Sequence, residues 1–299
     1  MRGRMGGSTF GAGFTLRSSD RRDDMPLDQP QDAPDRDKEM GFLDHLEELR
    51  RRLFYAVGAI VVTGGLLFVN KDWLFDTVLF GPRRPDFWTF QMLCALSETL
   101  QLGEALCVTE INYELINTTM LGNFTTHILV SFIGGVILSF PLLTQQVWGF
   151  VRPALKPVEV KAARGIGAAT TLLFFLGVGF GYFIISPMSL QFLGNYELSD
   201  VAARIGVMSY MKTIASITLA SGLIFQLPVI VYFLSKAGLV TPDLLKSYRR
   251  HALVGILVVS AIITPPDLTS QILVSLPVLV LYEIGIVISR RVTRRMAKV

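Results

Sequence analysis

The stretch FLDHLEELRRRL, residues 42–53, decides how the rest of the chain is understood. It is charged and amphipathic, and it continues without a break into the apolar run 53–69. A helix that changes from amphipathic to wholly apolar is typical of a chain that passes from water into lipid. We therefore expect water at one end of this segment and a membrane at the other.

Lys and Arg residues are concentrated in one of two alternating sets of segments that flank the apolar runs. Ten lie in residues 1–52, four in 149–164, four in 236–251 and five in 290–299. The other set has three in 71–122, one in 187–208 and none in 264–271. Because basic residues near span ends favour the cytoplasmic side, the first set is predicted to be cytoplasmic and the second external. The net charge of +4 therefore reports topology and attraction to anionic lipid rather than to nucleic acid.

The composition is that of an integral membrane protein. Hydrophobic residues make up 51% of the 299 residues, and the mean hydropathy is +0.48. A helix needs about 20 mostly apolar residues to cross a hydrocarbon core of about 30 Å. Six spans are predicted, at 53–70, 123–148, 164–186, 209–235, 251–263 and 271–289. The predicted fold is an all-α membrane protein, and an even number of spans places both termini in the cytoplasm.

The two ends of the chain differ from the six-span domain, 41–290. Residues 1–40 are rich in Gly, Asp, Arg and Pro and lack apolar periodicity, so we expect a disordered cytoplasmic extension. No apolar stretch or cleavage site of a targeting peptide follows before Leu53, and Met25 or Met40 as the true initiator is the alternative. Residues 291–299 are predicted to form a basic cytoplasmic tail.

Proline pairs and single prolines mark the predicted bends. Pro265 and Pro266 cannot continue a helix, so they predict a tight external turn that joins the fifth and sixth spans as an antiparallel hairpin. The fifth apolar run, 252–263, covers about 18 Å at 1.5 Å per residue, so either the bilayer is thinner there or His251 and Arg250 extend their side chains to the membrane surface. We hypothesise local thinning. Prolines 141, 228 and 277 lie within other spans, where each bends its helix or is tolerated, as is common in membranes.

Polar groups and glycines inside the spans suggest contacts between helices. Glu283 would cost about 2.5–3.5 kcal/mol at mid-membrane unless paired or protonated. It is either a contact for a partner helix or a proton-sensitive group, or it forms a structural bond to a neighbouring span. Gln226 in the fourth span is expected to hydrogen-bond to another helix, and the pair Gly177 and Gly181 permits close helix packing.

Both cysteines, Cys94 and Cys107, fall in the predicted external loop 71–122. An oxidising compartment would allow them to form a disulfide, whereas free buried thiols are the alternative. Alkylation with and without reductant would distinguish the two.

The sequence lacks the residue patterns of catalysis. Its three His residues lie on separate segments, and it has no HExxH, no GxSxG and no Walker lysine after a glycine loop. No Cys/His cluster has metal-binding spacing, and Glu283 has no second acid within a span. We therefore predict no enzymatic activity, no metal and no cofactor, which leaves a carrier, a channel or a receptor scaffold.

Carboxylates lie among basic residues in two predicted cytoplasmic segments. Glu47 and Glu48 occur in HLEELRRRL, and Glu159 occurs in RPALKPVEVKAAR. The pairs Glu47–Arg51 and Glu48–Arg52 have a favourable helical spacing, so part of this charge stabilises a helix. A surface carboxylate that is not fully neutralised is also suited to bind a guanidinium through two charge-assisted hydrogen bonds.

Several stretches, in this order, resemble the TatC family of the twin-arginine protein translocase. They are HLEELRRRL at 45–53, FPLLTQQVWGFVRPALKPVE at 140–159, TPDLLKSYRRH at 241–251, TPPD followed by SQ at 264–271, and LYEIGI at 281–286. The resemblance covers about residues 41–290. The stretches INYELINTTMLGNFTTH and GLIFQLPVIVYFLSKAGLVTPDLL are most similar to the Bacteroidota-type branch.

The resemblance implies six tilted helices that form a concave wall in the bacterial cytoplasmic membrane. It implies a receptor and assembly platform that binds the twin-arginine signal peptides of folded cargo for export. It also implies single-span partners of the TatA/TatB type and transport driven by the proton motive force. We expect a homo-oligomer within a larger complex.

The resemblance also assigns roles to individual residues. The carboxylates that bind the twin arginines correspond to Glu48 and Glu159. Arg50 belongs to the same N-terminal motif, and Phe150 and Pro153 shape the adjoining loop.

Other matches and departures lie within the spans. Pro141 matches the family's proline in the second span, and docking of partner helices is implied for the last two spans, where Glu283 and Gln271 are polar. Many relatives have Glu where this chain has Gln226. Ser199 stands where the family has an acid near the external end of the fourth span.

The alternative function is a proton- or ion-coupled small-solute transporter, with Glu283 and Gln226 at a midplane site. Against this alternative, the two halves of the chain share no repeat of motif or hydropathy. Solute uptake by the purified protein in liposomes, without a partner chain, would separate the two functions.

Overall fold

The computed structural model describes residues 42–99, 113–151, 157–195, 204–264 and 268–296. The chain divides into two units, 1–44 and 45–299. The expected disordered extension, 1–40, lies outside the described residues, as do Pro265, Pro266, Cys107 and Ser199.

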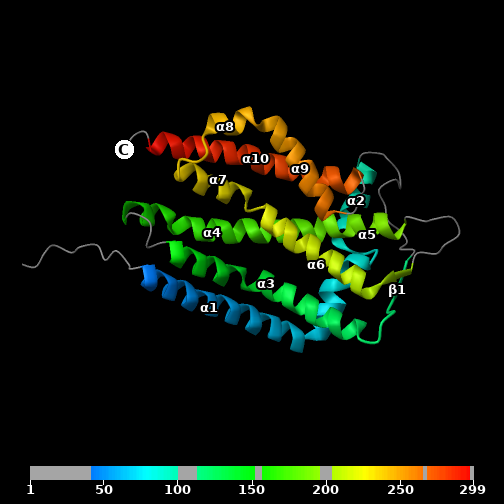
Figure 1. The fold of residues 1–299 in the computed structure, drawn as a ribbon. Coiled ribbons are helices and arrows are strands. Elements are labelled where there is room, and N and C mark those ends of the chain that lie inside the picture. The colour runs from blue at the N-terminus through cyan, green and yellow to red at the C-terminus, as the bar shows by residue number, and fades with distance from the viewer. Residues whose placement is uncertain (1–41, 100–112, 152–156, 196–203, 265–267, 297–299) are drawn as a thin grey trace, which may run out of the picture. The chain divides into compact units, whose positions relative to one another are not determined.

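Helices dominate the larger unit, and most of them run alongside one another (Figure 1). The helices that contain the predicted spans are α1 (Phe42–Val69), α3 (Gly122–Val151), α4 (Pro157–Phe180), α6 (Val207–Ile224), α7 (Leu227–Lys236), α9 (Arg249–Ile263) and α10 (Leu268–Met296). The other helices are η1 (Trp73–Leu79), η2 (Gly81–Arg83), α2 (Trp88–Thr99), η4 (Gly181–Ile185), α5 (Ser186–Gly194) and α8 (Pro242–Ser247). Two strands, β1 (Glu114–Ile116) and β2 (Arg204–Gly206), make the chain mostly helical rather than all-α.

Five helical segments of the described chain are long and apolar enough to cross a membrane. They are Leu46–Val69, Gly122–Phe150, Gly165–Gly194, Val207–Lys236 and Gln271–Met296. The predicted fifth span, 251–263, falls in α9, whose 15 residues cover only about 22 Å. Six membrane crossings therefore stay a prediction.

Several helices are longer than the apolar runs that predict them, because the polar residues next to these runs continue the helix. The charged segment 42–53 and the apolar run after it form the single helix α1, as the sequence predicts. The third predicted span, 164–186, is the middle of a continuous helical stretch through α4, η4 and α5. The sixth, 271–289, lies in α10, which includes much of the predicted basic tail and ends with Arg294 and Arg295 beside its negative C-terminal dipole.

The prolines within spans have different effects on their helices. Pro141 and Pro277 lie inside α3 and α10, which continue through them. Pro228 lies in the first turn of α7, directly after a break at Phe225 and Gln226 that separates α7 from α6. The predicted fourth span is therefore two helices rather than one, because Pro228 cannot donate a backbone hydrogen bond to the preceding turn.

Glycines allow α4 and α6 to approach closely, as the sequence predicts. A methyl group on Gly177 would lie 2.7 Å from the carbonyl oxygen of Ser221, and one on Gly181 would lie 2.8 Å from Cβ of the same residue. From the other helix, a methyl group on Gly222 would lie 2.8 Å from the ring of Phe174. Backbone-to-backbone contact of this kind supplies the dispersion energy that holds membrane helices together.

A second close contact joins α7 to α10. The Ser235 hydroxyl donates a 2.8 Å hydrogen bond to the Ser289 hydroxyl, and both side chains are buried. One turn away, Gly285 faces Val231 at van der Waals distance. The break therefore divides the fourth span into two helices: α6, which packs on α4, and α7, which packs on α10.

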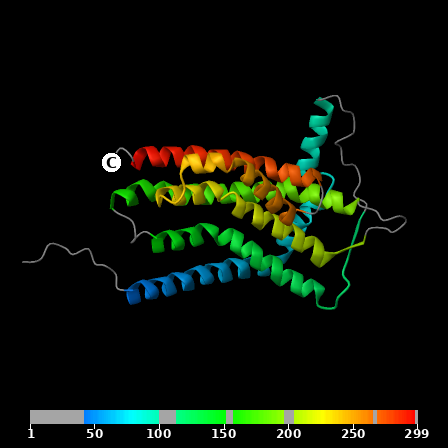
Figure 2. The same ribbon diagram turned by 45° about the horizontal axis from the view of Figure 1, so that its top comes forward.

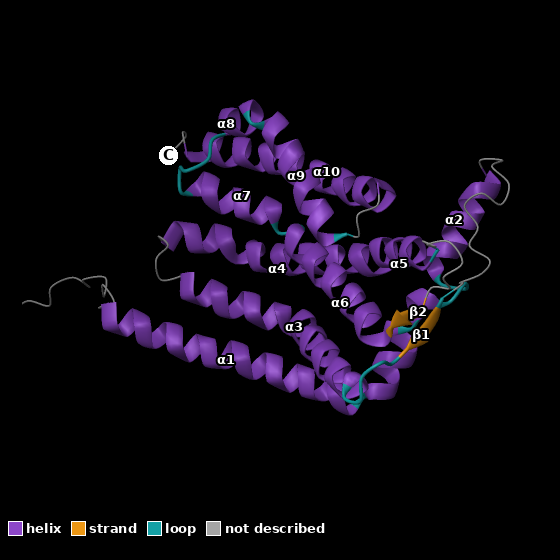
Figure 3. Ribbon diagram, turned by 45° about the vertical axis from the view of Figure 1, so that its right-hand side comes forward, coloured by secondary structure: helices purple, strands orange, loops and turns teal. Residues whose placement is uncertain are grey.

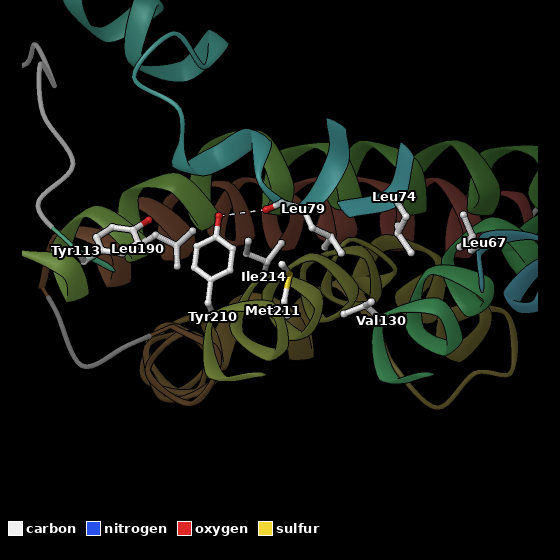
Figure 4. Packing of buried hydrophobic residues seen from close by; sticks show 9 residues of the cluster. All are labelled: Leu67, Leu74, Leu79, Tyr113, Val130, Leu190, Tyr210, Met211 and Ile214. Carbon is white, nitrogen blue, oxygen red and sulfur yellow. Dashed lines mark hydrogen bonds between the residues drawn. The ribbon is translucent and has the colours of Figure 1, made fainter. Parts of the chain in front are cut away.

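A cluster of buried apolar residues lies at the end of the structure that the sequence predicts to be external (Figure 4). Its members come from α1, η1, α3, α5, α6 and the segment before β1: Leu67, Leu74, Leu79, Tyr113, Val130, Leu190, Tyr210, Met211 and Ile214. The Tyr210 hydroxyl donates to the carbonyl oxygen of Leu79 over 3.1 Å. Burial raises the pKa of Tyr113 to about 12, against the opposing effect of the nearby Arg83.

The two strands join two loops that are far apart in the sequence and that are both predicted to be external (Figure 3). They pair in parallel, with Glu114 opposite Arg204 and Ile116 opposite Gly206. The preceding loop also contains α2, where Cys94 is disulfide-bonded.

We predict that Gly177→Ala lowers the melting temperature of the purified protein in detergent. Overpacking against Ser221 should cost about 1–3 kcal/mol. Gly179→Ala is the matched control, because nothing lies within 4 Å of the added methyl group and Ala favours a helix more than Gly does. Equal melting temperatures for the two variants would contradict the close α4–α6 contact.

Candidate functional site

The Glu48 carboxylate near the start of α1 is nearly buried and only partly paired. Its Oε1 accepts hydrogen bonds from Nε and Nη2 of Arg52, at 3.0 and 2.5 Å. Its Oε2 is buried and has no hydrogen-bond partner among the described residues. The side chain of Glu48 is 10% exposed and that of Arg52 is 23% exposed. One oxygen of this carboxylate is therefore available to another donor.

Arg52 reaches from α1 to the end of α3. A methyl group on Gly149 would collide with Nη1 of Arg52, so the guanidinium occupies the space beside this glycine. Phe150, the next residue, is half-buried. The contact places the Glu48–Arg52 pair beside the α3 segment that the sequence assigns to the same site.

The other predicted site residues are described only in part. Arg50 is exposed, and its guanidinium carbon lies 5.7 Å from the centre of the Phe54 ring. Glu159 lies in the first turn of α4, but its side chain is outside the described part, and so is the whole of Pro153. The described residues contain no ion pair between Glu47 and Arg51, although the equivalent pair of Glu48 is formed.

Gln226 lies in the break of the fourth span and bonds to a neighbouring helix. Its Nε2 donates to the carbonyl oxygen of Thr170 in α4 over 3.2 Å, which confirms the predicted contact between helices. Its Oε1 is buried without a hydrogen-bond partner in the described chain. Gln226 lines an apolar groove of about 380 Å³ between α3, α4 and α7, together with Trp148 and Phe233.

The pair of α9 and α10 is held by polar contacts in antiparallel register. Glu283 Oε2 accepts a 2.7 Å hydrogen bond from Nη2 of Arg249, and both side chains are half-exposed. Gln271 Nε2 donates to the carbonyl oxygen of Leu257 over 3.3 Å. Glu283 thus forms the structural bond that was one of its two predicted roles. It lies level with the first residue of α9.

In the described part of the chain, no group of three or more His, Cys, Asp and Glu side chains is placed to hold a metal ion. The described polar groups that can bind another molecule do so by hydrogen bonding, and they are the partly paired Glu48 near the start of α1 and Gln226 in the groove.

A family model described as Sec-independent protein translocase protein (TatC) matches residues 44–277. The chain belongs to the TatC family. The protein of that name from Blattabacterium sp. subsp. Periplaneta americana is 37% identical over 259 residues, which cover 86% of this chain and 97% of the relative. This confirms the resemblance inferred from the sequence.

Solved structures agree with the family assignment. A crystal structure of the twin-arginine translocase receptor TatC matches with a TM-score of 0.60 and 30% identity, covering 83% of this chain and 99% of that one. A second TatC structure, in the detergent DDM, matches with a TM-score of 0.63 and 31% identity, covering 81% and 97%. The TatC assignment confirms a non-enzymatic translocase component, and it gives no support to the small-solute transporter.

Arg249 is a site residue that the sequence did not indicate. From the sequence, a role near the start of the fifth span was expected only for Arg250 and His251. A signal was available, because Arg249 precedes Pro266 by 17 residues and Glu283 follows it by 17. In an antiparallel hairpin, residues equidistant from the turn lie opposite each other.

We predict that Arg249→Ala lowers the stability of this TatC-family protein by about 1 kcal/mol, because it leaves the Glu283 carboxylate unpaired. Thermal unfolding in detergent measures the change. Arg250→Ala is the control, since this exposed neighbour lies outside the pair. Adding Glu283→Gln to Arg249→Ala should recover part of the loss, and a double variant less stable than Arg249→Ala would argue against the pair.

Proposed function

We propose that this protein is the receptor for twin-arginine signal peptides in a Sec-independent translocase of the bacterial cytoplasmic membrane. In this role it binds the signal peptides of folded cargo on the cytoplasmic side and serves as an assembly platform for export. The TatC family match and the two receptor structures support the proposal.

The single observation that carries the binding site is the unpaired oxygen of Glu48. A guanidinium needs an acceptor that is held in place and shielded from water, and Glu48 Oε2 is buried and free of a partner in the described chain. Arg52 already occupies Oε1 and holds the carboxylate in one rotamer. A signal-peptide arginine can therefore bind without an ordering cost for this side chain.

Glu159 is proposed as the second carboxylate for the arginine pair. It occurs in the first turn of α4, directly after the segment that follows α3. Arg50, Phe150 and Pro153 are proposed to shape the same surface. Two carboxylates at neighbouring helix ends would discriminate two arginines from two lysines, because only a guanidinium forms a planar, bidentate pair.

We further propose six membrane crossings in a concave wall, with both termini in the cytoplasm. The distribution of Lys and Arg supports this topology, since the four basic segments alternate with three external segments that are poor in Lys and Arg. In this arrangement α9 is the fifth crossing, and its 15 residues require a thinned bilayer or a contact that shields its ends.

Partners of the TatA/TatB type are proposed to dock on α9 and α10, and the proton motive force to drive transport. An apolar stripe on α10 is exposed along its length: Ile272, Leu276, Val280, Ile284 and Val287. Glu283 flanks the stripe with its half-exposed carboxylate. A single-span helix with an apolar face and one polar group would match this surface.

We predict that Glu48→Gln weakens binding of a twin-arginine signal peptide to the protein in nanodiscs by about 10- to 100-fold. The expected loss is that of a charge-assisted hydrogen bond, about 1.5–3 kcal/mol. Fluorescence anisotropy of a labelled peptide measures the dissociation constant.

Glu47→Gln is the matched control, because this exposed carboxylate neighbours Glu48 and should matter little. A twin-lysine peptide should bind weakly to every variant. Unchanged affinity in the folded Glu48→Gln protein, or equal losses in both variants, would refute the proposed site.

A further inference from the structure

The exposed side of α2 is apolar along one stripe. Trp88, Met92 and Ala95 recur at i, i+4 and i+7, so they lie on one helical face. Trp88 is 54% exposed and Met92 is 51% exposed. Gln91 and Glu98 are also exposed and lie about 60–80° to one side of that stripe. The helix is therefore amphipathic on the side that faces away from the protein.

The start of α2 is fixed against the helical stretch of the third span. The Thr89 hydroxyl donates a hydrogen bond to the carbonyl oxygen of Phe183 in η4. The Trp88 ring meets the Phe183 ring edge-on at 6.0 Å, and Phe90 is buried. From this anchor α2 leads away from the long helices at a steep angle to them (Figure 2). A helix that crosses the spans in this way runs roughly along the membrane plane.

The contact with Phe183 sets the depth of α2 in the membrane. Arg164 is the last charged residue before the apolar part of α4, and Gly165 begins the candidate span. Phe183 follows Gly165 by 18 residues, which is about 27 Å along a helix. The hydrocarbon core is about 30 Å thick, so Phe183 and the attached Trp88 lie at its far boundary.

A second tryptophan lies at the same level by the same reasoning. The helix α1 ends at Val69, 16 residues or about 24 Å after Leu53, where its apolar part begins, and Trp73 starts η1 four residues later. Its side chain is 56% exposed. Tryptophan prefers this interface because its ring is apolar and its N–H needs a polar partner.

We infer that α2 is an interfacial anchor that lies in the outer leaflet, with Trp88, Met92 and Ala95 in contact with phospholipid. The occupant of the apolar stripe is the boundary between headgroups and acyl chains, because the contact of Trp88 with Phe183 holds the stripe at the depth of that boundary. Gln91 and Glu98 face the headgroups and water. The exposed Arg84, four residues before Trp88, carries a charge suited to a lipid phosphate.

This inference is independent of the signal-peptide site, because α2 lies at the opposite end of the long helices from the start of α1, where Glu48 occurs (Figure 1). An external protein that covers the stripe is the competing occupant, and the test below separates the two. The anchor would hold the external loops at a fixed height above the bilayer, since the same loop joins η2 to β1.

Tryptophan fluorescence of the full chain in phosphatidylcholine vesicles tests the anchor. The chain contains three Trp residues, so W73F/W148F leaves Trp88 as the only emitter. We expect lipid brominated near the upper acyl chain to quench Trp88 several-fold more strongly than aqueous iodide does. The matched control adds W88F and Q91W, which moves the probe to the polar side, where iodide should quench more strongly than the brominated lipid.

Two outcomes would overturn the inference. Quenching of Trp88 by iodide but not by lipid would place α2 in water, and shielding from both would mean that protein covers the stripe. If the variants do not fold, the unaltered chain can be labelled by a phospholipid with a photoreactive acyl chain. Adducts on the 88–99 peptide would support the anchor, and adducts confined to the spans would refute it.

Discussion

The close contact between α4 and α6 is the constraint on which the rest of the structure depends. Three glycines, Gly177, Gly181 and Gly222, remove the side chains that would hold the two helices apart. The stretch Val207–Lys236, which contains α6, is the most buried of the five long apolar segments. Because lipid offers no hydrophobic force between helices, this fit of backbone on backbone supplies much of the attraction. The helix α6 then contacts α3, α5 and α9, so its position fixes theirs.

Polar groups add direction to this packing. Serine hydroxyls join α7 to α10, Gln271 joins α10 to α9, and Thr63 of α1 donates to the carbonyl oxygen of Gly135 in α3. In a membrane each such bond spares a polar group from hydrocarbon. Of the four buried side-chain oxygens that lack a hydrogen-bond partner in the described chain, two belong to long side chains, Oε2 of Glu48 and Oε1 of Gln226. The Glu48 oxygen lies near α3, and the Gln226 oxygen lies in the groove beside α4. A donor from another chain that bound at either place would offset the free-energy cost of burying that oxygen without a partner.

Much of the architecture followed from the sequence because the membrane imposes simple rules. Hydropathy located the long helices, the spacing of Gly177 and Gly181 predicted the tight contact, and the i,i+4 spacing predicted the Glu48–Arg52 pair. Hydropathy could not predict that β1 and β2 pair, because three-residue strands in separate loops leave no periodicity. The partner of Glu283 was missed because hydropathy does not give the register between helices. Glu47 and Glu48 each have an arginine four residues later, so the local sequence does not distinguish their roles. Only the packing of α1 against α3 shows that Glu48 is the partly buried one of the two.

The break at Phe225 and Gln226 has a mechanical consequence. The helix before it is bound to α4 through glycine contacts, and the helix after it is bound to α10 through Ser235 and Ser289. Pro228 removes one backbone hydrogen bond from the regular helical pattern at this break, so the two helices are less firmly coupled there than they would be in an unbroken helix. Any rotation of the C-terminal hairpin against the central helices must therefore be absorbed by the backbone torsions of these two residues. The hydrogen bond from Gln226 to Thr170 holds the break against α4, so it is positioned to restrain such a rotation.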